Sequence, residues 1–266
     1  HFAGALLRSR AIAICAAMPA MRAQNVVTSY SMYGYGILND RATSMQRQMG
    51  GVGIAQNSGR QINAMNPASY ASIDSLTFLF DMGADLSILW NKEGDQSERR
   101  TGGGLDYVTM QFPFSSHFGG SLGLIPYSSV GYAFGSDIAH GTRQNQGIGG
   151  INQAYAGVAT QWFGFSLGAN LYYNFGTITN SLYAIPQGET SSLFEHVMQI
   201  RDFDITLGLQ YSRRWHRTSK ITLGLIYSPK MSMHGTTWAT FQNITSSTTK
   251  PDTVGYQHMG GRYYRP

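Results

Sequence analysis

Hydrophobic and polar residues alternate without interruption along the stretch Phe163 to Phe175, FGFSLGANLYYNF. The odd-numbered positions carry Phe, Leu, Ala and Tyr, and the even-numbered positions carry Gly, Ser, Asn and one Tyr. An extended strand places these two sets on opposite faces. The stretch is about thirteen residues long, which exceeds the roughly 5–6 residues of a globular strand and suits the about 9–11 residues of a tilted transmembrane strand. The pattern therefore predicts a transmembrane β-strand.

The same alternation recurs in other segments of the chain. The predicted strands are residues 76–90, 105–114, 117–127, 154–162, 163–175, 202–211 and 221–228. In each of them one face is apolar and the other is rich in Gly, Ser, Thr and Asn. We expect the apolar faces to meet lipid and the polar faces to line a lumen. Four carboxylates are then predicted to face the lumen, namely Asp81, Asp85, Asp202 and Asp204.

The predicted connections alternate in length. The short ones are residues 113–116, the turn at Trp162 and Phe163, and residues 212–219, whereas residues 91–104, 128–150, 176–196 and everything after 229 are predicted as long connections. Short turns on one side and long loops on the other are typical of an outer-membrane β-barrel. Aromatic residues gather at the strand ends, as expected where strands cross the two membrane interfaces.

Composition agrees with a barrel in lipid. The chain has 266 residues, of which 12% are charged and 32 are glycines, with a formal charge of +5. A globular protein usually has about 25% charged residues and about 7% glycine. Apart from the leader, no apolar run is long enough for a membrane helix, which needs about 18 residues. The largest basic cluster lies around Arg213 and Arg214, and we interpret it as a turn facing anionic head groups rather than a nucleic-acid site.

The first residues resemble an export signal. Arg8 and Arg10 precede the small, apolar run Ala11 to Ala17, and a cleavage point is predicted before Gln24. The one cysteine, Cys15, lies inside this predicted signal peptide, so the mature chain would have neither a disulfide nor thiol chemistry.

Residues 24–75 lack a sustained apolar period and consist of glycine-rich and turn-forming pieces. Gly50, Gly51 and Gly53 could suggest a phosphate loop, but no strand precedes them and no Gly-Lys-Ser/Thr follows. Asn66-Pro67 is a turn former, because the Asn side chain can bond the backbone two residues on while Pro fixes φ.

Together these pieces resemble a known family. Arg41, the run Met49 to Ala55 and Asn66-Pro67-Ala68 are similar to the N-terminal hatch of the FadL/TodX family of outer-membrane transporters, in its divergent Bacteroidetes form. The repeats at Ser166 to Tyr172 and Thr222 to Lys230 are similar to strands of that family's barrel. The resemblance implies a hatch that controls the lumen, with these hatch residues: Gly50, Gly51, Gly53, Asn66, Pro67, Ala68 and Tyr70.

The resemblance also implies how a solute would pass. A hydrophobic compound such as a long-chain fatty acid would enter from the extracellular loops and leave sideways through a kinked strand. Pro126 is the predicted kink, because proline donates no ladder hydrogen bond. The alternative is that Pro126 ends its strand and begins the loop 128–150.

The predicted fold is therefore all-β, an antiparallel transmembrane β-barrel with an N-terminal hatch or plug. An eight-stranded barrel has a lumen filled by side chains and leaves no room for a hatch. An unclosed sheet would expose backbone groups to hydrocarbon. We expect about fourteen strands in the whole barrel, following the family, with roughly the first half present here. The predicted parts are a signal peptide at 1–23, a hatch at 24–75 and a partial barrel at 76–266.

Catalysis finds little support in the sequence. The histidines are scattered without metal-ligand spacing, so we expect no metal, no cofactor and no enzyme activity. Paired carboxylates can catalyse glycoside hydrolysis. We instead interpret the four aspartates as lining a hydrated lumen or as forming hydrogen bonds to the hatch.

The predicted function is an outer-membrane channel in a Gram-negative bacterium that takes up hydrophobic compounds. Its partners would be a hydrophobic small molecule or fatty acid and outer-membrane lipid, and no nucleic acid. The alternative is a barrel that serves as carrier or scaffold in outer-membrane protein secretion or assembly, with proteins of that machinery as partners. A hydrophilic porin and a soluble all-β domain are further alternatives.

Overall fold

The computed structural model describes residues 28–93, 96–138, 141–186, 191–215, 219–244 and 252–264. The predicted signal peptide at 1–23 and its cleavage point lie outside these residues. No helix within the described ranges is long and apolar enough to cross a membrane.

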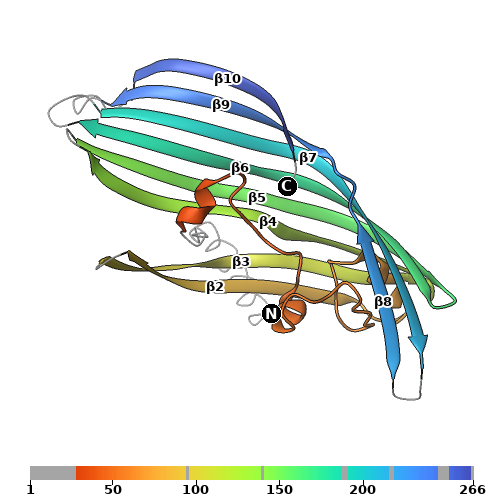
Figure 1. The fold of residues 1–266 in the computed structure, drawn as a ribbon. Helices are drawn as coiled ribbons and strands as arrows, with labels where there is room; N and C mark the ends of the chain where they lie inside the picture. Colours follow the sequence, from red (N-terminus) through yellow and green to blue (C-terminus); the bar gives the residue numbers. More distant parts are fainter. Residues whose placement is uncertain are drawn as a thin grey trace, which may run out of the picture.

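One antiparallel sheet forms most of the molecule (Figure 1). Its long strands are β2 (Leu79–Glu93), β3 (Gln96–Ser115), β4 (Phe118–Ile138), β5 (Gly141–Trp162), β6 (Phe165–Pro186), β7 (Ser191–Arg214), β8 (Lys220–Tyr227), β9 (Ser232–Ile244) and β10 (Asp252–Tyr264). The order is β10-β9-β7-β6-β5-β4-β3-β2, with β8 also on β7. The sheet curls into a half-barrel, which confirms the all-β prediction.

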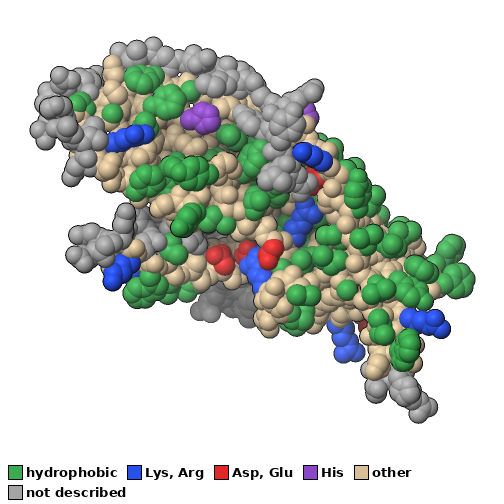
Figure 2. Space-filling model, in the orientation of Figure 1, with side chains coloured by type: hydrophobic (Ala, Val, Ile, Leu, Met, Phe, Trp, Pro, Cys, Tyr) green, Lys and Arg blue, Asp and Glu red, His purple; other side chains and the backbone are tan. Residues whose placement is uncertain are grey.

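The predicted alternation is confirmed in the strands. On β6, Ser166, Asn170 and Tyr172 are buried on the concave face, whereas Phe165 and Leu167 are exposed on the convex face. The outward side chains of β7 and β8 are likewise Leu, Ile, Phe and Tyr. Hydrophobic side chains cover large parts of the surface in Figure 2, while acidic side chains are seen mainly in the middle of the view and basic side chains are spread over it.

The predicted short turns are also confirmed, and they define the short-turn end of the sheet. Between β5 and β6 the chain reverses through Phe163 and Gly164, both with positive φ of 49° and 86°. Two central residues with positive φ make the turn that best matches strand twist. The strand therefore begins at Phe165 rather than at Phe163. Lys220 pairs with Arg214 at the β7–β8 turn, so the described part of the basic cluster lies at this end.

The prediction of long loops on the opposite side was wrong. The described residues of 91–104, 128–150 and 176–196 lie in strands, which pair in hairpins such as Ile138 with Gly141. Apolar residues of these parts, such as Val130, Tyr132 and Ile178, are buried on the concave face, so the expected pattern of an apolar outward face and a polar inward face did not predict strands here. Backbone hydrogen bonds hold these parts of the chain in the sheet, so that the strands β3 to β7 are 20–24 residues long.

The region after Pro229 is not one long connection either. It contains β9 and β10, which pair with each other over most of their length. Residues 261–264, which were predicted as part of this connection, belong to β10. Among the described residues β10 pairs with β9 and β2 pairs with β3, so the two outer strands do not meet.

β3 and β4 separate part-way along the sheet, as Figure 1 shows. Their register runs from Ser115–Phe118 to Val108–Leu124 and goes no further. Beyond that point a short strand, β1 (Ile37–Leu38), pairs with Ser129 and Ser128 on β4. Pro126 lies in this region but does not end its strand, because β4 continues to Ile138 with a register shift between Pro126 and Ser128.

Residues 28–78 lie against the concave face and are called the inner segment below. Besides β1 they contain η2 (Ser29–Met32), the short helix α2 (Ser44–Gln48) and η3 (Pro67–Ser72). In Figure 1 the inner segment, drawn in red and orange, follows the inside of the curve toward the short-turn end.

Candidate functional site

The contact between the inner segment and the sheet is the candidate site, because it joins buried polar groups from distant parts of the chain. η3 lies on the inward face of β5, β6 and β7, where the sheet offers glycine. A Cβ at Gly168 would lie 2.6 Å from the backbone nitrogen of Ala68, and one at Gly208 would lie 2.8 Å from Cδ of Pro67. Both distances are shorter than non-bonded contacts allow. Glycine at these positions therefore lets the two backbones approach each other.

Asn66 fixes the start of η3 in the predicted way. Its Oδ1 accepts a hydrogen bond from the Ala68 backbone N–H at 3.1 Å. Its Nδ2 donates to the backbone oxygens of Ile54 at 2.7 Å and of Leu209 on β7 at 3.4 Å. Asn66, Pro67 and Ala68 are all buried. This element is thus both a turn and an attachment to the sheet.

Tyr70 is the largest side chain that η3 buries. Its hydroxyl accepts a hydrogen bond from Nδ2 of Asn170 on β6 at 3.0 Å, and its backbone oxygen accepts one from Nε2 of Gln111 on β3 at 3.2 Å. It packs with Tyr155 and Tyr172 in a buried cluster. Burial raises the pKa of Tyr70 well above its usual value. One residue of the inner segment therefore links β3 and β6, which are not neighbours in the sheet.

The predicted hatch glycines Gly50, Gly51 and Gly53 lie in the turn that follows α2. Gly50 and Gly51 have φ of 75° and 80°, and a Cβ at Gly53 would lie 2.6 Å from Sδ of Met65. Next to them, Arg47 forms a salt bridge with Asp106, which sits at the register shift of β3. These glycines shape the inner segment.

Arg41 makes the main ionic contact between the inner segment and the sheet. Its guanidinium donates to Asp204 Oδ2 at 3.4 Å, to Thr206 Oγ1 at 3.0 Å and to Gln153 Oε1 at 3.3 Å. It also lies 4.0 Å from the centre of the Tyr172 ring. Such stacking of a guanidinium on an aromatic face is favourable. The sequence marked Arg41 only as part of the family motif and did not predict these partners.

The four predicted inward aspartates have different surroundings. Asp204 is buried on Arg41, while Asp202 lies 3.2 Å from Nδ1 of His234. Asp81 accepts a hydrogen bond from the Tyr107 hydroxyl at 3.2 Å, and Asp85 is exposed. Asp204 therefore contacts the inner segment through Arg41, whereas Asp202 and Asp81 contact side chains of the sheet. The described residues contain no group of three or more His, Cys, Asp or Glu that could hold a metal ion.

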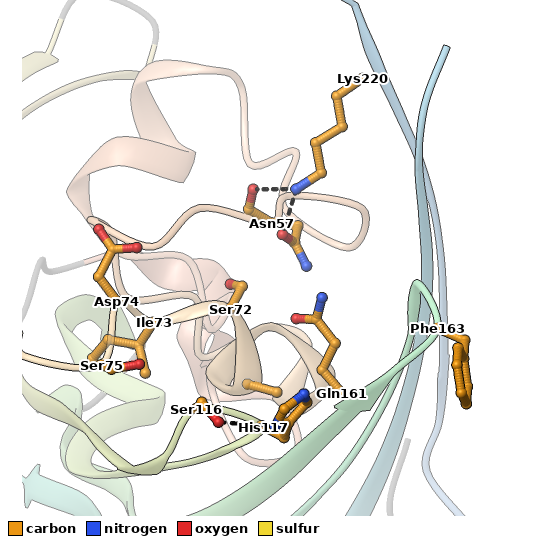
Figure 3. Close-up of a pocket in the computed structure, with 11 residues that line it drawn as sticks. Asn57, Ser72, Ile73, Asp74, Ser75, Ser116, His117, Gln161, Phe163 and Lys220 are labelled. Atoms are coloured by element: carbon orange, nitrogen blue, oxygen red, sulfur yellow. Dashed lines mark hydrogen bonds between the residues drawn. The ribbon is translucent and has the colours of Figure 1, made fainter.

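A polar pocket of 440 Å³ opens at the short-turn end between the inner segment and the turns of the sheet (Figure 3). Lys220 Nζ donates to Asn57 Oδ1 at 2.7 Å, and Ser116 Oγ lies 2.9 Å from His117 Nδ1. In Figure 3 Asp74 lies on the other side of the pocket from His117, so the three residues do not form a catalytic triad.

The concave face becomes apolar toward the end of the sheet opposite the short turns, which is called the long-hairpin end below. There it carries a buried apolar cluster of Tyr127, Val130, Tyr132, Ile151, Ile178, Ile200 and Met233. Met32 and Tyr35 of the inner segment pack against this cluster. The inner segment therefore contacts glycine and polar groups near the short-turn end and apolar groups nearer the long-hairpin end.

The comparison with protein families decides the family. The model of the BamG family matches residues 7–259. The chain belongs to the BamG family. Neither the comparison with curated proteins nor that with solved structures gave a match. BamG is a family associated with the BAM complex, and the matched residues span the inner segment and nearly the whole described sheet.

Proposed function

We propose that this BamG-family chain is an outer-membrane β-barrel with an internal plug, and that it serves as a carrier or scaffold in the assembly of outer-membrane proteins. The observation that carries the proposal is the family match over residues 7–259. Three features of the sheet support it, namely its apolar convex face, its curl and the inner segment on its concave face.

Aromatic contacts support a position in the membrane. One band lies at the short-turn end, where Phe165 and Tyr211 are 4.5 Å apart, and another includes Tyr173 and Phe203, 5.0 Å apart. The eight steps along the strand from Phe165 to Tyr173 rise about 20 Å, taking about 3.3 Å per step and a strand tilt of about 40°. This height is close to the roughly 25 Å apolar band of an outer-membrane barrel. We place the short turns on the periplasmic side.

The open edges of the sheet support a larger barrel. Unpaired strand edges are not tolerated in hydrocarbon, so further strands or a partner must cover β2 and β10 in the membrane. A barrel of about fourteen strands, as in the FadL/TodX resemblance, would provide this cover.

Purification from native membranes tests the assembly role. The affinity-tagged full-length protein, extracted in mild detergent, is expected to bring down the subunits of the BAM complex. Its depletion is expected to lower the amounts of other outer-membrane β-barrels while inner-membrane proteins stay constant. If depletion leaves those barrels unchanged and the tagged protein purifies alone, the assembly role is wrong.

Uptake of hydrophobic compounds is the second candidate function. The apolar cluster around Ile151 and Ile200, on the inward face, favours it, because small apolar ligands bind in concave apolar sites. In this role Met32 and Tyr35 occupy the site until a solute displaces them. Uptake of a fluorescent fatty acid into vesicles that contain the full-length protein is the test, and Pro126→Ala tests whether the solute leaves beside Pro126.

A further inference from the structure

β3 and β4 stop pairing part-way along the sheet, and each continues with one edge turned away from its paired neighbour. Their last pair in this direction is Val108 with Leu124. Among the described residues, 96–107 of β3 pair with β2 alone, and 125–138 of β4 pair with β5 and with the two-residue strand β1. Pro126 lies just beyond the last pair and cannot donate a ladder hydrogen bond.

The free part of β4 lies toward the long-hairpin end. Backbone register leads from Leu124 through Ala154 to Tyr173, which belongs to the aromatic band farther from the short turns. Beyond Leu124, β4 therefore runs away from this band, into the part of the sheet that we place outside the lipid. An unpaired edge is not tolerated in hydrocarbon, whereas in water its N–H and C=O groups can bind another strand.

The inner segment shows what this edge binds. β1 pairs antiparallel with Ser128 and Ser129, and the Asn39 N–H donates to the backbone oxygen of Tyr127 at 2.8 Å. Gly36, just before β1, has φ of 87°, and a Cβ there would collide with the backbone oxygen of Ser129. The edge therefore accepts an extended backbone at close range, with a glycine beside Ser129.

The inner segment covers only the first part of the edge. At Gly131 a side chain replaces a strand partner, because the Gly131 N–H donates to Oγ of Ser31 at 3.1 Å and its backbone oxygen accepts from the Thr28 N–H at 2.7 Å. Backbone groups that face one edge recur at every second residue of a strand, so those of Ala133 and Gly135 face the same way. Among the described residues, β4 pairs with β5 alone beyond Gly131. The edge thus continues past its cover.

We propose that this edge, residues 127–136 of β4, is a docking site for an extended strand of a partner protein at the outer surface, and that residues 28–39 occupy part of it until the partner binds. The partner strand runs antiparallel to β4, as β1 does, and main-chain hydrogen bonds supply its affinity. It carries a small residue beside Ser129, where the inner segment has Gly36.

The partner is a different protein rather than a second copy. Two β4 edges that pair with each other would meet the inner segment of both copies, because residues 28–39 cover the first part of each edge. The inference deepens the proposed function, since it names the kind of partner that the scaffold binds. It rests on that function and on the proposed position of the membrane.

Photocross-linking in intact cells tests the docking site. Phe134 is exposed and lies within the edge. Replacing it by the photoreactive residue benzoylphenylalanine in the full-length protein is expected to give an adduct with one other protein under ultraviolet light. Ala133→Pro, which removes an edge N–H, is expected to lower the yield of this adduct at least about tenfold, the loss expected for one unmade backbone hydrogen bond. The matched control is Ala133→Val, which keeps the N–H and should leave the yield unchanged.

Three results of this experiment would overturn the docking of a partner strand. They are the absence of any adduct, an equal yield in Ala133→Pro and Ala133→Val, and an adduct with the mass of two copies of this chain. If purification from native membranes yields the BAM subunits while Ala133→Pro has no effect, the docking site alone is wrong.

A peptide with the sequence of residues 28–39 tests whether the edge of the purified full-length protein binds a strand. In Gly36→Ala the new Cβ collides with the backbone of Ser129 and displaces the protein's own residues 28–39. The labelled peptide is therefore expected to bind this variant at least about tenfold more tightly than the unmodified protein, because its site is no longer occupied.

Gly34→Ala is the matched control for the peptide experiment. Gly34 also has a positive φ, of 61°, but a Cβ there meets no atom within 4 Å. Its affinity for the peptide should equal that of the unmodified protein. Equal affinities of Gly36→Ala and Gly34→Ala would show that the edge binds no strand. If the native purification yields no BAM subunits, the assembly role is wrong, and the peptide still decides whether the edge binds a strand.

Discussion

A single buried hydroxyl illustrates how the inner segment is held. Tyr70 is fully buried, and its hydroxyl is bonded to Asn170. A phenol in such a place must stay protonated, because its anion would lose hydration without gaining a cation. This is the physical cause of the raised pKa of Tyr70.

We predict that Tyr70 makes the docked inner segment sensitive to alkali. Because the pKa of Tyr70 is raised in the folded state, its contribution is fully present below the unfolded value of about 10 and is lost as the pH rises above it. Tyr70→Phe is expected to cost about 1 kcal/mol near neutral pH through the lost hydrogen bond. It should also make the alkaline fall in stability less steep. Denaturant unfolding of both proteins over a pH series measures the two effects, and parallel curves would contradict the prediction.

Some residue-level features could be predicted from the sequence and others could not. The turn at Asn66-Pro67 follows from local chemistry and was predicted, because the partner of Asn66 is only two residues away. The contact of Arg41 with Asp204 joins residues 163 positions apart. Sequence reasoning placed Asp204 on the inward face but contained nothing that would select Arg41 as its partner.

At the scale of elements, apolar alternation predicted only the part of each strand that carries it. β6 continues beyond Phe175 to Pro186. Its apolar residues there are Ile178 and the uninterrupted run Leu182 to Pro186, which do not alternate with polar residues, so this half of the strand was predicted as loop. Its backbone pairs with β5 and β7 to the end, for example Ile178 with Gly149 and with Met198.

We predict that the glycines beneath η3 cannot be replaced. Gly168→Ala places a Cβ against the backbone of Pro67 and Ala68, which cannot move aside as a side chain can. The expected loss is about 2–3 kcal/mol, in the range of overpacked cores. Limited proteolysis should then cut the inner segment while leaving the sheet intact.

Gly135→Ala is the control for this prediction. Its new Cβ would meet Cγ of Gln144 at 3.3 Å, which is the flexible part of a side chain. Its effect is expected to stay within about 0.5 kcal/mol, as for an ordinary surface substitution. Equal protease resistance of both variants would mean that η3 does not need the close approach.

The whole molecule is taller than a membrane. β5 has 22 residues and β7 has 24, whereas a tilted transmembrane strand needs about 9–11. If the short turns lie in the periplasm, as we propose, the halves of the hairpins nearer the long-hairpin end stand outside the lipid. Their buried apolar residues, such as Val130 and Ile178, then face the interior of the half-barrel.

Labelling of intact cells tests this arrangement. Gln144 is exposed and lies in the half of β5 nearer the long-hairpin end. Gln144→Cys is therefore expected to react with a membrane-impermeant maleimide. A cysteine at Leu167, which is exposed on the convex face near the short-turn end, should react at least about tenfold more slowly because lipid covers it. Fast labelling of Leu167→Cys would contradict the proposed position of the membrane.

The inner segment precedes in the chain every strand of the half-barrel on which it rests. Arg41 bonds Thr206 across 165 positions, and Asn57 bonds Gln210 across 153. Contacts of such separation form late in folding, because the cost of closing the intervening loop must be met first. Until β7 has joined the sheet, Arg41 and Asn57 lack these partners. The segment that leaves the ribosome first is therefore expected to reach its final place only after the sheet has formed around it.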